Sequence, residues 1–125
     1  MKQQITIDLP YKVSSNKIYS TNCHWAERKR LKDLMRWALV PVIHSINPMT
    51  KGTLTFDFRF KSRPLDCSNC SFMAKMIEDV LVDHFKIVND TPQYVKRIII
   101  SSSKGDRDVC LLTMEDEYEF RNEKM

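Results

Sequence analysis

Hydrophobic and polar residues alternate in two segments of the chain, and this alternation predicts two half-buried strands. In QQITIDL, residues 3–9, isoleucine and leucine occupy every second position until Pro10 ends the pattern. In GTLTFDFRFK, residues 52–61, every second residue from Leu54 to Phe60 is apolar, which is the clearest strand pattern in the chain. Each segment should therefore present one face to a core.

Two further strands are expected toward the C-terminus. Residues 94–102 (YVKRIIISS) and 108–115 (DVCLLTME) are rich in the apolar and β-branched residues that favour strands. Lys104, Gly105 and Asp106 lie between them and have the composition of a turn. The two strands are therefore expected to pair as a hairpin.

Apolar residues recur every three or four positions in two other segments, which predicts two amphipathic helices. The first begins near His24, and Pro41 should end or kink it near Val40. Its apolar stripe consists of Leu31, Leu34, Met35, Ala38 and Leu39. The second spans roughly residues 69–84. Its inward positions are Phe72, Met73, Met76, Val80 and Leu81.

These elements follow one another in the order β-α-β-α-β-β, with an irregular loop over residues 11–23. The order predicts an α+β fold, with a mixed β-sheet of about four strands covered by two main helices. A chain of 125 residues has the size of one domain, so residues 1–125 are expected to form a single domain. The acidic end, residues 116–125, is expected to be a frayed or partly helical tail.

The composition is typical of a folded protein that lies outside the membrane. Hydrophobic residues make up 42% of the chain, and no apolar run approaches the roughly 20 residues that a membrane span needs. The opening MKQQITIDLPY lacks the apolar stretch of a secretory signal. We therefore expect a soluble, cytoplasmic protein whose four cysteines are free thiols.

The charge of the chain is unevenly distributed. The net charge is +4, but residues 1–65 hold 12 Lys and Arg against 4 Asp and Glu, whereas residues 66–125 hold 8 against 12. A basic N-terminal half suits a polyanion such as nucleic acid. The alternative is a solvated charged surface without a ligand.

The stretch LDCSNC, residues 65–70, places two cysteines three positions apart, a spacing found in zinc and redox sites. A zinc site would need further ligands, and Cys23 and His24 have a spacing unlike that of a finger or ribbon. Ordinary thiols at Cys67 and Cys70 are therefore the favoured interpretation. A zinc-dependent adaptor is the disfavoured alternative.

Polar residues around the second predicted helix have two interpretations. Asp66 and Asn69 would cap its first N–H groups, Lys75 and Asp79 have the spacing of a surface ion pair, and Asp90 lies in the turn-like sequence NDTP. If the loop carrying Asp90 folds back over the helix start, however, Asp90 would meet Asp66. Two converging carboxylates form the hard-oxygen site that Mg²⁺ prefers. Beside a basic surface, such a site predicts metal-assisted phosphodiester hydrolysis.

Taken together, these segments resemble the RusA family of Holliday-junction resolvases over nearly the whole chain. ITIDLPYKVSSNKIYS is similar to the family's strand, proline and Ser-x-Asn-Lys-x-Tyr loop, and HWAERKRLK is similar to the basic helix start of its phage members. LDCSNCSFMAKMIEDVLVDHFKIVNDTPQYV resembles the family core, which has Leu-Asp-x-Asp-Asn, a helix with Lys and then Asp, and a loop ending in Asp. The joint spacing from residue 66 to residue 90 is the specific part of this resemblance.

The resemblance implies a role for each matching residue. Asp66 and Asp90 match metal-binding aspartates, and Asn69 matches the asparagine that closes the first motif. Lys75 matches a lysine needed for catalysis, and Asp79 matches the acid one turn further along. The catalytic residues implied are Asp66, Asn69, Lys75 and Asp90. The metal site implied comprises Asp66, Ser68, Asp79 and Asp90.

The resemblance also implies the substrate, cofactor and partners. The family acts as a homodimer with Mg²⁺, for which Mn²⁺ is a possible substitute, and nicks four-way or branched DNA junctions in recombination and repair. A phage-encoded member would act in the cytoplasm of its bacterial host. The basic residues expected to bind the DNA phosphates are Lys17, Arg28, Lys29, Arg30, Lys32 and Arg36.

One position departs from the family pattern, because Ser68 occupies the place of the family's second Asp. A serine hydroxyl is neutral and a much weaker Mg²⁺ ligand than a carboxylate. Glu78 and Asp83 would compensate only from less favourable angles on the helix. The alternative function is therefore a catalytically weakened relative that binds branched DNA or a host protein as a phage-encoded regulator.

Overall fold

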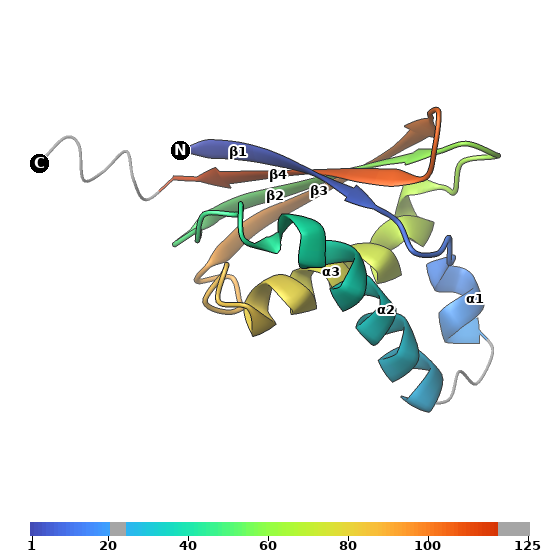
Figure 1. Cartoon of the computed structure of the whole chain (residues 1–125), viewed down its shortest axis with the longest axis horizontal. Helices are drawn as coiled ribbons and strands as arrows, with labels where there is room; N and C mark the ends of the chain where they lie inside the picture. The colour runs from blue at the N-terminus through green and yellow to red at the C-terminus, as the bar shows by residue number, and fades with distance from the viewer. Residues whose placement is uncertain (21–24, 118–125) are drawn as a thin grey trace, which may run out of the picture.

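The computed structural model describes residues 1–20 and 25–117, which contain one four-stranded sheet and three α-helices (Figure 1). The strands are β1 (Lys2–Asp8), β2 (Gly52–Phe60), β3 (Val95–Lys104) and β4 (Val109–Asp116). The helices are α1 (Ser15–Ser20), α2 (Trp25–Ile43) and α3 (Ser71–Asp83), and a short 3-10 helix, η1 (Cys67–Cys70), leads into α3. The predicted α+β class, with a mixed sheet and two main helices, is confirmed.

The sheet has the strand order β1-β4-β2-β3, in which β2 and β3 are parallel and the other neighbouring strands are antiparallel. The expected hairpin between the last two strands is wrong, because β2 lies between them. The loop after β3 crosses the end of β2, where the Gly105 N–H donates a hydrogen bond of 2.9 Å to the Phe60 carbonyl. A Cβ on Gly105 would lie 2.9 Å from the Cβ of Arg59, so a glycine permits this close crossing.

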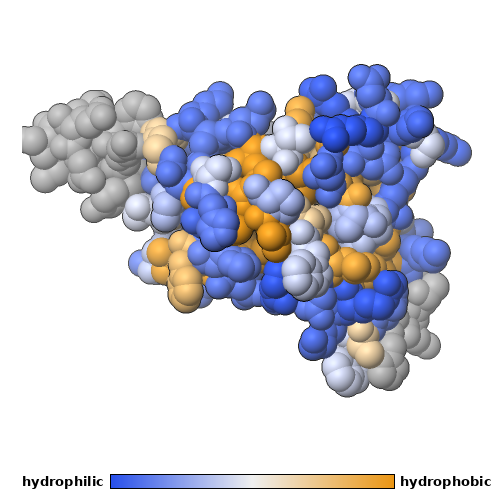
Figure 2. Space-filling model, viewed as in Figure 1, coloured by the Kyte–Doolittle hydropathy of each residue, from blue (hydrophilic) through white to orange (hydrophobic). Residues whose placement is uncertain are grey.

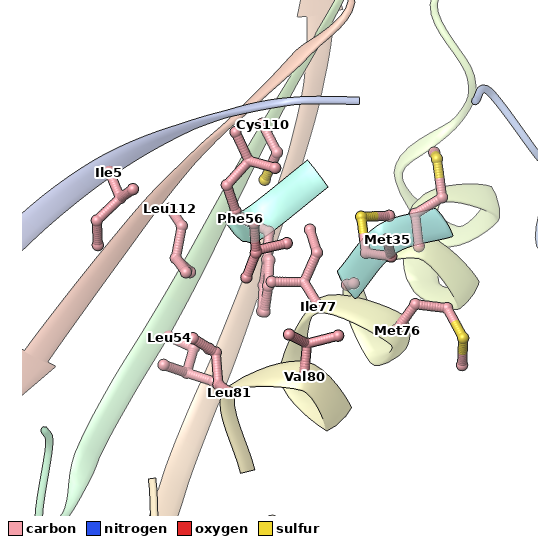
Figure 3. Close-up of a cluster of buried hydrophobic side chains, with 14 of the residues drawn as sticks. Ile5, Met35, Leu54, Phe56, Met76, Ile77, Val80, Leu81, Cys110 and Leu112 are labelled. Atoms are coloured by element: carbon pink, nitrogen blue, oxygen red, sulfur yellow. The ribbon is translucent and has the colours of Figure 1, made fainter. Parts of the chain in front are cut away.

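The core lies between the sheet and the helices, which cover one side of it (Figure 1). The alternation in β2 places Leu54 and Phe56 on the covered face with no exposed surface. Ile77, Val80 and Leu81 of α3 point toward these side chains (Figure 3). Helix α2 packs against α3 and β1. In the view of Figure 2, apolar side chains gather in the middle and polar side chains surround them.

One helical prediction is wrong, and for the first long helix the structure shows the short continuation after Pro41 that was one of the expected outcomes. Part of the expected loop over residues 11–23 forms α1, where the Ile18 N–H donates a hydrogen bond of 3.2 Å to the Ser14 carbonyl. Ile18 is buried in the core, and this burial stabilises a turn that its polar neighbours do not predict. Pro41 lies inside α2, which continues to Ile43 because that side chain is also buried in the core.

Two other predictions fall partly outside the described residues. His24, the expected start of the first helix, is one of the residues that the structure does not describe, as are residues 118–125 of the expected tail. The beginning of that tail is ordered, because Asp116 ends β4 and its carboxylate accepts a hydrogen bond of 2.9 Å from the Thr50 N–H. Within the described part of the chain, no helix combines the length and apolar character of a membrane span.

Candidate functional site

The start of α3 is capped by a residue from the N-terminal part of the chain. Ser15, the first residue of α1, is buried, and its hydroxyl accepts a hydrogen bond of 2.7 Å from the Phe72 N–H. The same oxygen lies 2.9 Å from the Ser71 hydroxyl and 3.2 Å from the Asn69 carbonyl, to which it donates. A helix start leaves N–H groups unpaired, so Ser15 supplies a cap that the local sequence lacks. This contact places α1 against the LDCSNC segment.

The residues of that segment do not cap α3. Asp66 occupies the N-cap position of η1, but its side chain makes no capping hydrogen bond, so the expectation that it caps the helix is wrong. Its carboxylate is exposed and forms no hydrogen bond or ion pair with any other described residue. The Asn69 side chain instead accepts a hydrogen bond of 3.2 Å from the Asn16 N–H. Ser68 is exposed beside them. The Asp66 carboxylate is therefore available to a ligand.

Lys75 lies at the centre of a cluster of three carboxylates. Its ammonium group lies 3.3 Å from the Asp79 carboxylate and 3.4 Å from that of Glu78, and it donates a short hydrogen bond to Asp90. The predicted i,i+4 pair between Lys75 and Asp79 is confirmed. The loop that carries Asp90 does fold back onto α3, and the contact that it makes there is with Lys75. The Asp66 side chain takes no part in this contact. We call these four residues the Lys75 cluster.

The pKa values in the Lys75 cluster reflect a competition between burial and neighbouring charges. Burial opposes the charge of Lys75, but Asp90, Asp79 and Glu78 together raise its pKa above the ordinary value, so it stays protonated. The hydrogen bond from Lys75 lowers the pKa of Asp90. Burial raises the pKa of Glu78 despite the attraction of Lys75. One oxygen of Glu78, Oε2, is buried without a hydrogen-bond partner.

Two of the expected DNA-binding cations form ion pairs along the surface of α2. The Lys29 ammonium lies 3.1 Å from the Asp33 carboxylate, and the Arg30 guanidinium lies 2.6 Å from that of Glu27. All four side chains are more than two-fifths exposed. Exposed pairs of this kind are weak and screened by solvent, so these cations are readily available to other anions.

Two more of these cations connect α2 to α3. Lys32 and Arg36 approach the Asp83 carboxylate to 3.3 Å and 2.9 Å. Although burial opposes its charge, their hydrogen bonds lower the pKa of Asp83. Asp79 lies one helical turn before Asp83, so basic and acidic side chains line the boundary between the two helices. The Lys75 cluster therefore lies at one end of a polar boundary that leads to the basic residues of α2.

The remaining two expected DNA-binding residues lie at α1. Arg28 of α2 places its guanidinium 5.5 Å from the centre of the Tyr19 ring, a cation–π contact that links α2 to α1. Lys17 lines a hollow of about 440 Å³ between α1 and α2, together with Lys12, Arg30 and Glu27, the carboxylate partner of Arg30. Three cations against one carboxylate leave this concave surface with a net positive charge, which suits an anionic ligand such as phosphate.

The two cysteines of LDCSNC lie in different environments. Cys67 is exposed, whereas Cys70 is buried, and burial raises the pKa of the Cys70 thiol to about 11. A raised pKa disfavours the thiolate that zinc binding and redox chemistry require. Cys23, the other thiol considered for zinc, lies outside the described residues. The environment of Cys70 therefore suits an ordinary buried thiol, whereas Cys67 lies at the surface.

The oxygen ligands near α3 suit a hard cation. Within residues 1–20 and 25–117, no group of three or more His, Cys, Asp or Glu side chains is arranged to hold a metal ion. The exposed Asp66 carboxylate has free lone pairs, and Asp90 is a second carboxylate on a surface loop. Carboxylate oxygens are the ligands that Mg²⁺ prefers, so the chemistry of these donors fits the expected cofactor.

Two residues of this region were not identified by sequence patterns. Ser15 lies in a polar segment, where nothing local indicates a contact with a helix more than fifty residues away. Glu78 was considered only as a weak substitute ligand, but it is the buried acid of the Lys75 cluster. A signal for Glu78 was present, because it is a charged residue between the apolar positions Ile77 and Leu81 of an otherwise buried helix face.

The whole sequence was compared with protein-family models and with curated proteins. A scan against protein-family models finds no match, and a search of curated proteins finds no significant relative.

Proposed function

We propose that the protein is a Mg²⁺-dependent endonuclease that resolves four-way DNA junctions. The observation that carries this proposal is the Lys75 ammonium held among the carboxylates of Glu78, Asp79 and Asp90, one turn beyond the segment that carries Asp66. A fixed cation on the helix that follows the exposed Asp66 carboxylate is a combination that phosphodiester hydrolysis uses. The resemblance to the RusA resolvases points to the same chemistry.

Asp66 and Asp90 are the residues that would hold the metal ion, and the resemblance adds Ser68 and Asp79. When bound, Mg²⁺ polarises a phosphoryl oxygen and lowers the pKa of the attacking water. Asn69 holds the segment in place, because its side chain accepts a hydrogen bond from the Asn16 N–H and its carbonyl accepts one from Ser15. The position of the Asp66 backbone is thereby fixed relative to α1.

Lys75 would stabilise the negative charge that develops on the phosphoryl group or on the leaving oxygen. Its ammonium is charged at neutral pH, since its pKa lies above the ordinary value, and 45% of its side chain is exposed. Glu78 and Asp79 hold this ammonium from the helix while Asp90 holds it from the loop. Lys75 is thus pre-positioned without being buried.

The cations of α1 and α2 would bind the DNA backbone. Their carboxylate partners are exposed, so a phosphate can replace a carboxylate at little cost. Contacts of this kind position the duplex and carry no sequence information. Two copies of the protein, related by a two-fold axis, would place one site on each of two opposed strands of a symmetric junction.

The test is cleavage of a labelled four-way junction in the presence of Mg²⁺. Paired symmetric nicks are expected for the natural protein, and they should be lost in Asp66→Asn and in Asp90→Asn. Asp106→Asn is the matched control, because Asp106 is an exposed aspartate in the turn after β3. If no nicks form with either Mg²⁺ or Mn²⁺, or if both site variants cleave normally, the endonuclease proposal is wrong.

A second function is favoured by the serine at position 68. An exposed hydroxyl stands there in place of a carboxylate, and the Asp90 carboxylate is held by Lys75. A protein with this site would bind branched DNA, or a host protein, with little cleavage. Ser68→Asp distinguishes the two functions: a large gain in cleavage with unchanged junction affinity would show that the natural site is catalytically weakened.

A further inference from the structure

Both tryptophans of the chain lie exposed on α2 and flank one open hollow. Trp25 is 70% exposed and Trp37 is 72% exposed, and the sequence contains no other tryptophan. The hollow has a volume of about 390 Å³, and the surface between the two indoles is formed by Lys29, Arg30, Asp33 and Leu34. We call these six residues the Trp hollow. Indoles combine a large apolar face with a polar edge, and two of them exposed on one helix indicate a binding surface.

The charge around the Trp hollow favours an anionic partner. From residue 25 to residue 37, α2 holds five Lys and Arg against two Asp and Glu, a balance of +3. Asp83 of α3, which binds Lys32 and Arg36, lowers this balance only to +2. The neighbouring hollow between α1 and α2 is also positively charged. Charge complementarity therefore favours a polyanion over a neutral apolar protein surface.

The two cations within the Trp hollow can exchange their present partners for phosphates. The Lys29 ammonium lies 3.1 Å from the Asp33 carboxylate, and the Arg30 guanidinium lies 2.6 Å from that of Glu27. Both pairs are exposed, so breaking them costs little. Aromatic faces beside a positively charged surface are the combination with which proteins bind single-stranded nucleic acid.

An exposed indole stacks readily only on a base whose face is open. Inside a duplex each base already stacks on its neighbours, so an aromatic side chain enters only by unstacking a base step. In a single strand, or at the branch point of a junction, such a face is available without this cost. We infer that the Trp hollow binds unpaired bases of DNA: Trp25 and Trp37 stack on the bases, while Lys29 and Arg30 contact the phosphates. The inference rests on the proposed function for the identity of the polyanion as branched DNA.

The separation of the two tryptophans sets the length of strand that reaches both. They are twelve residues apart, which corresponds to about 18 Å along a helix. A stacked strand advances about 3.4 Å per nucleotide, so the indoles lie about five nucleotide steps apart. Phosphate contacts alone would hold any arm of a junction equally well. Stacking on unpaired bases adds a preference for the branch point, where the strands to be cut exchange partners.

The first measurement uses the two tryptophans as probes, since no other tryptophan contributes to the fluorescence. The natural protein is titrated with a mixed-sequence DNA strand of about 12 nucleotides, a length within the usual site sizes, and with the duplex that this strand forms with its complement. Both titrations contain a chelator and no metal ion. The single strand should quench the tryptophan fluorescence strongly as it binds, and the duplex should quench it much less.

The second measurement compares variants by the anisotropy of the same labelled DNAs. Trp37→Leu should weaken binding of the single strand by about 5- to 150-fold, the loss expected for one stacked base, and change the duplex affinity little. Trp37→Phe keeps an aromatic face and should retain most of the single-strand affinity. Lys29→Met should weaken both DNAs by similar factors, because it removes a phosphate contact. Phe85→Leu is the matched control, since Phe85 is an exposed aromatic residue beyond the end of α3 (84% exposed) and should change neither affinity.

Neither measurement requires cleavage, so the two proposals can fail separately. A protein that binds the single strand through Trp37 but cuts no junction would retain this inference and lose the endonuclease proposal. Circular dichroism of each variant checks that α2 remains folded.

Three results would overturn the inference. The single strand does not bind, or binds without quenching the fluorescence. Trp37→Leu weakens the duplex as much as the single strand, or Trp37→Phe is as weak as Trp37→Leu. Without DNA, the fluorescence shifts to shorter wavelength as the protein concentration rises, which would show that a second copy of the protein covers the indoles instead.

Discussion

Helices α2 and α3 are the two long helices of the protein, and they carry their charges in different ways. On α3, Lys75 and Glu78 interact at the edge of the core, and the Glu78 side chain is only 5% exposed. On α2, Arg30 and Glu27 have the same i,i+3 spacing, but both side chains lie in solvent. Equal spacing therefore produces a constrained cluster on one helix and an adaptable surface on the other, and burial makes the difference.

The largest expected effect is on the cleavage rate, and it should follow substitution on α3 but not on α2. Lys75→Met should reduce the rate of junction cleavage by about 10²–10³-fold, the typical loss when a group that stabilises the transition state is removed. Lys29→Met on α2 should change the cleavage rate at saturating DNA very little and weaken DNA binding instead. Single-turnover cleavage and junction affinity, measured for both variants, check this contrast. Equal losses of rate in the two variants would contradict it.

The pH dependence of stability should have opposite signs on the two helices. Burial raises the pKa of Glu78 above its unfolded value of 4.5, so the natural protein loses stability as the pH rises through the interval between these values. Glu78→Gln removes this loss and should be more stable at neutral pH, by on the order of 1 kcal/mol. Its advantage should vanish as the pH falls to 4.5 or below. Urea unfolding at several pH values measures the difference.

Glu27→Gln on α2 is the matched comparison for Glu78→Gln. The hydrogen bond from Arg30 lowers the pKa of Glu27, so its contribution to stability is present above pH 4.5 and is lost as the pH falls. The variant should therefore be slightly less stable than the natural protein at neutral pH and equal to it in acid. If both variants change the free energy of unfolding at neutral pH in the same direction, burial does not explain the difference between the two glutamates.

A smaller effect is expected at the end of α3, where Phe85 has a positive φ of 60° and is 84% exposed. The Lys86 N–H donates to the Leu81 carbonyl and the Phe85 N–H to that of Val82, the pattern of a helix end that usually contains glycine. Phe85→Gly should raise the free energy of unfolding by about 0.5–1 kcal/mol. Phe85→Ala retains the Cβ and should give no such gain, which chemical denaturation of both variants can establish.

The smallest effect is expected for the exposed charges of α2. Arg30→Ala should leave the free energy of unfolding nearly unchanged, because its partner Glu27 remains solvated when the pair is broken. The melting temperature of this variant should accordingly stay close to that of the natural protein. A loss comparable to the one caused by a core substitution would show that α2 depends on its surface pairs.

Much of the fold could be predicted because its strands alternate strictly. Leu54, Phe56, Phe58 and Phe60 are all fully buried, as their spacing predicts. The strand order could not be predicted from local patterns. The turn at Gly105 has the same composition whether β4 pairs with β3 as a hairpin or crosses the end of β2 to pair on its other side. Strand pairing is decided by the whole sheet, and the most apolar strand, β2, occupies an inner position.

Contacts of the candidate site could be predicted only where they follow from the regular spacing of a helix. The contact between Lys75 and Asp79 follows from helical spacing, so the sequence was sufficient for it. The contact of Asp90 with Lys75 depends on how a loop folds back, and the role of Ser15 depends on packing between distant segments. Neither kind of contact leaves a periodic pattern in the sequence. The sequence therefore suggests Asp66 as the helix cap, whereas the structure caps α3 with the distant Ser15.

The insertion of β2 between β3 and β4 also determines when the sheet can form during folding. Strand β1 pairs only with β4, so Lys2 must find Glu115 at the other end of the described chain. Strand β2 likewise gains its antiparallel neighbour only when β4 arrives. Pairing between such distant segments slows folding, and a growing chain on the ribosome would hold β1 without a partner until the last strand emerged. We therefore expect slow, highly cooperative folding that depends on residues 109–116.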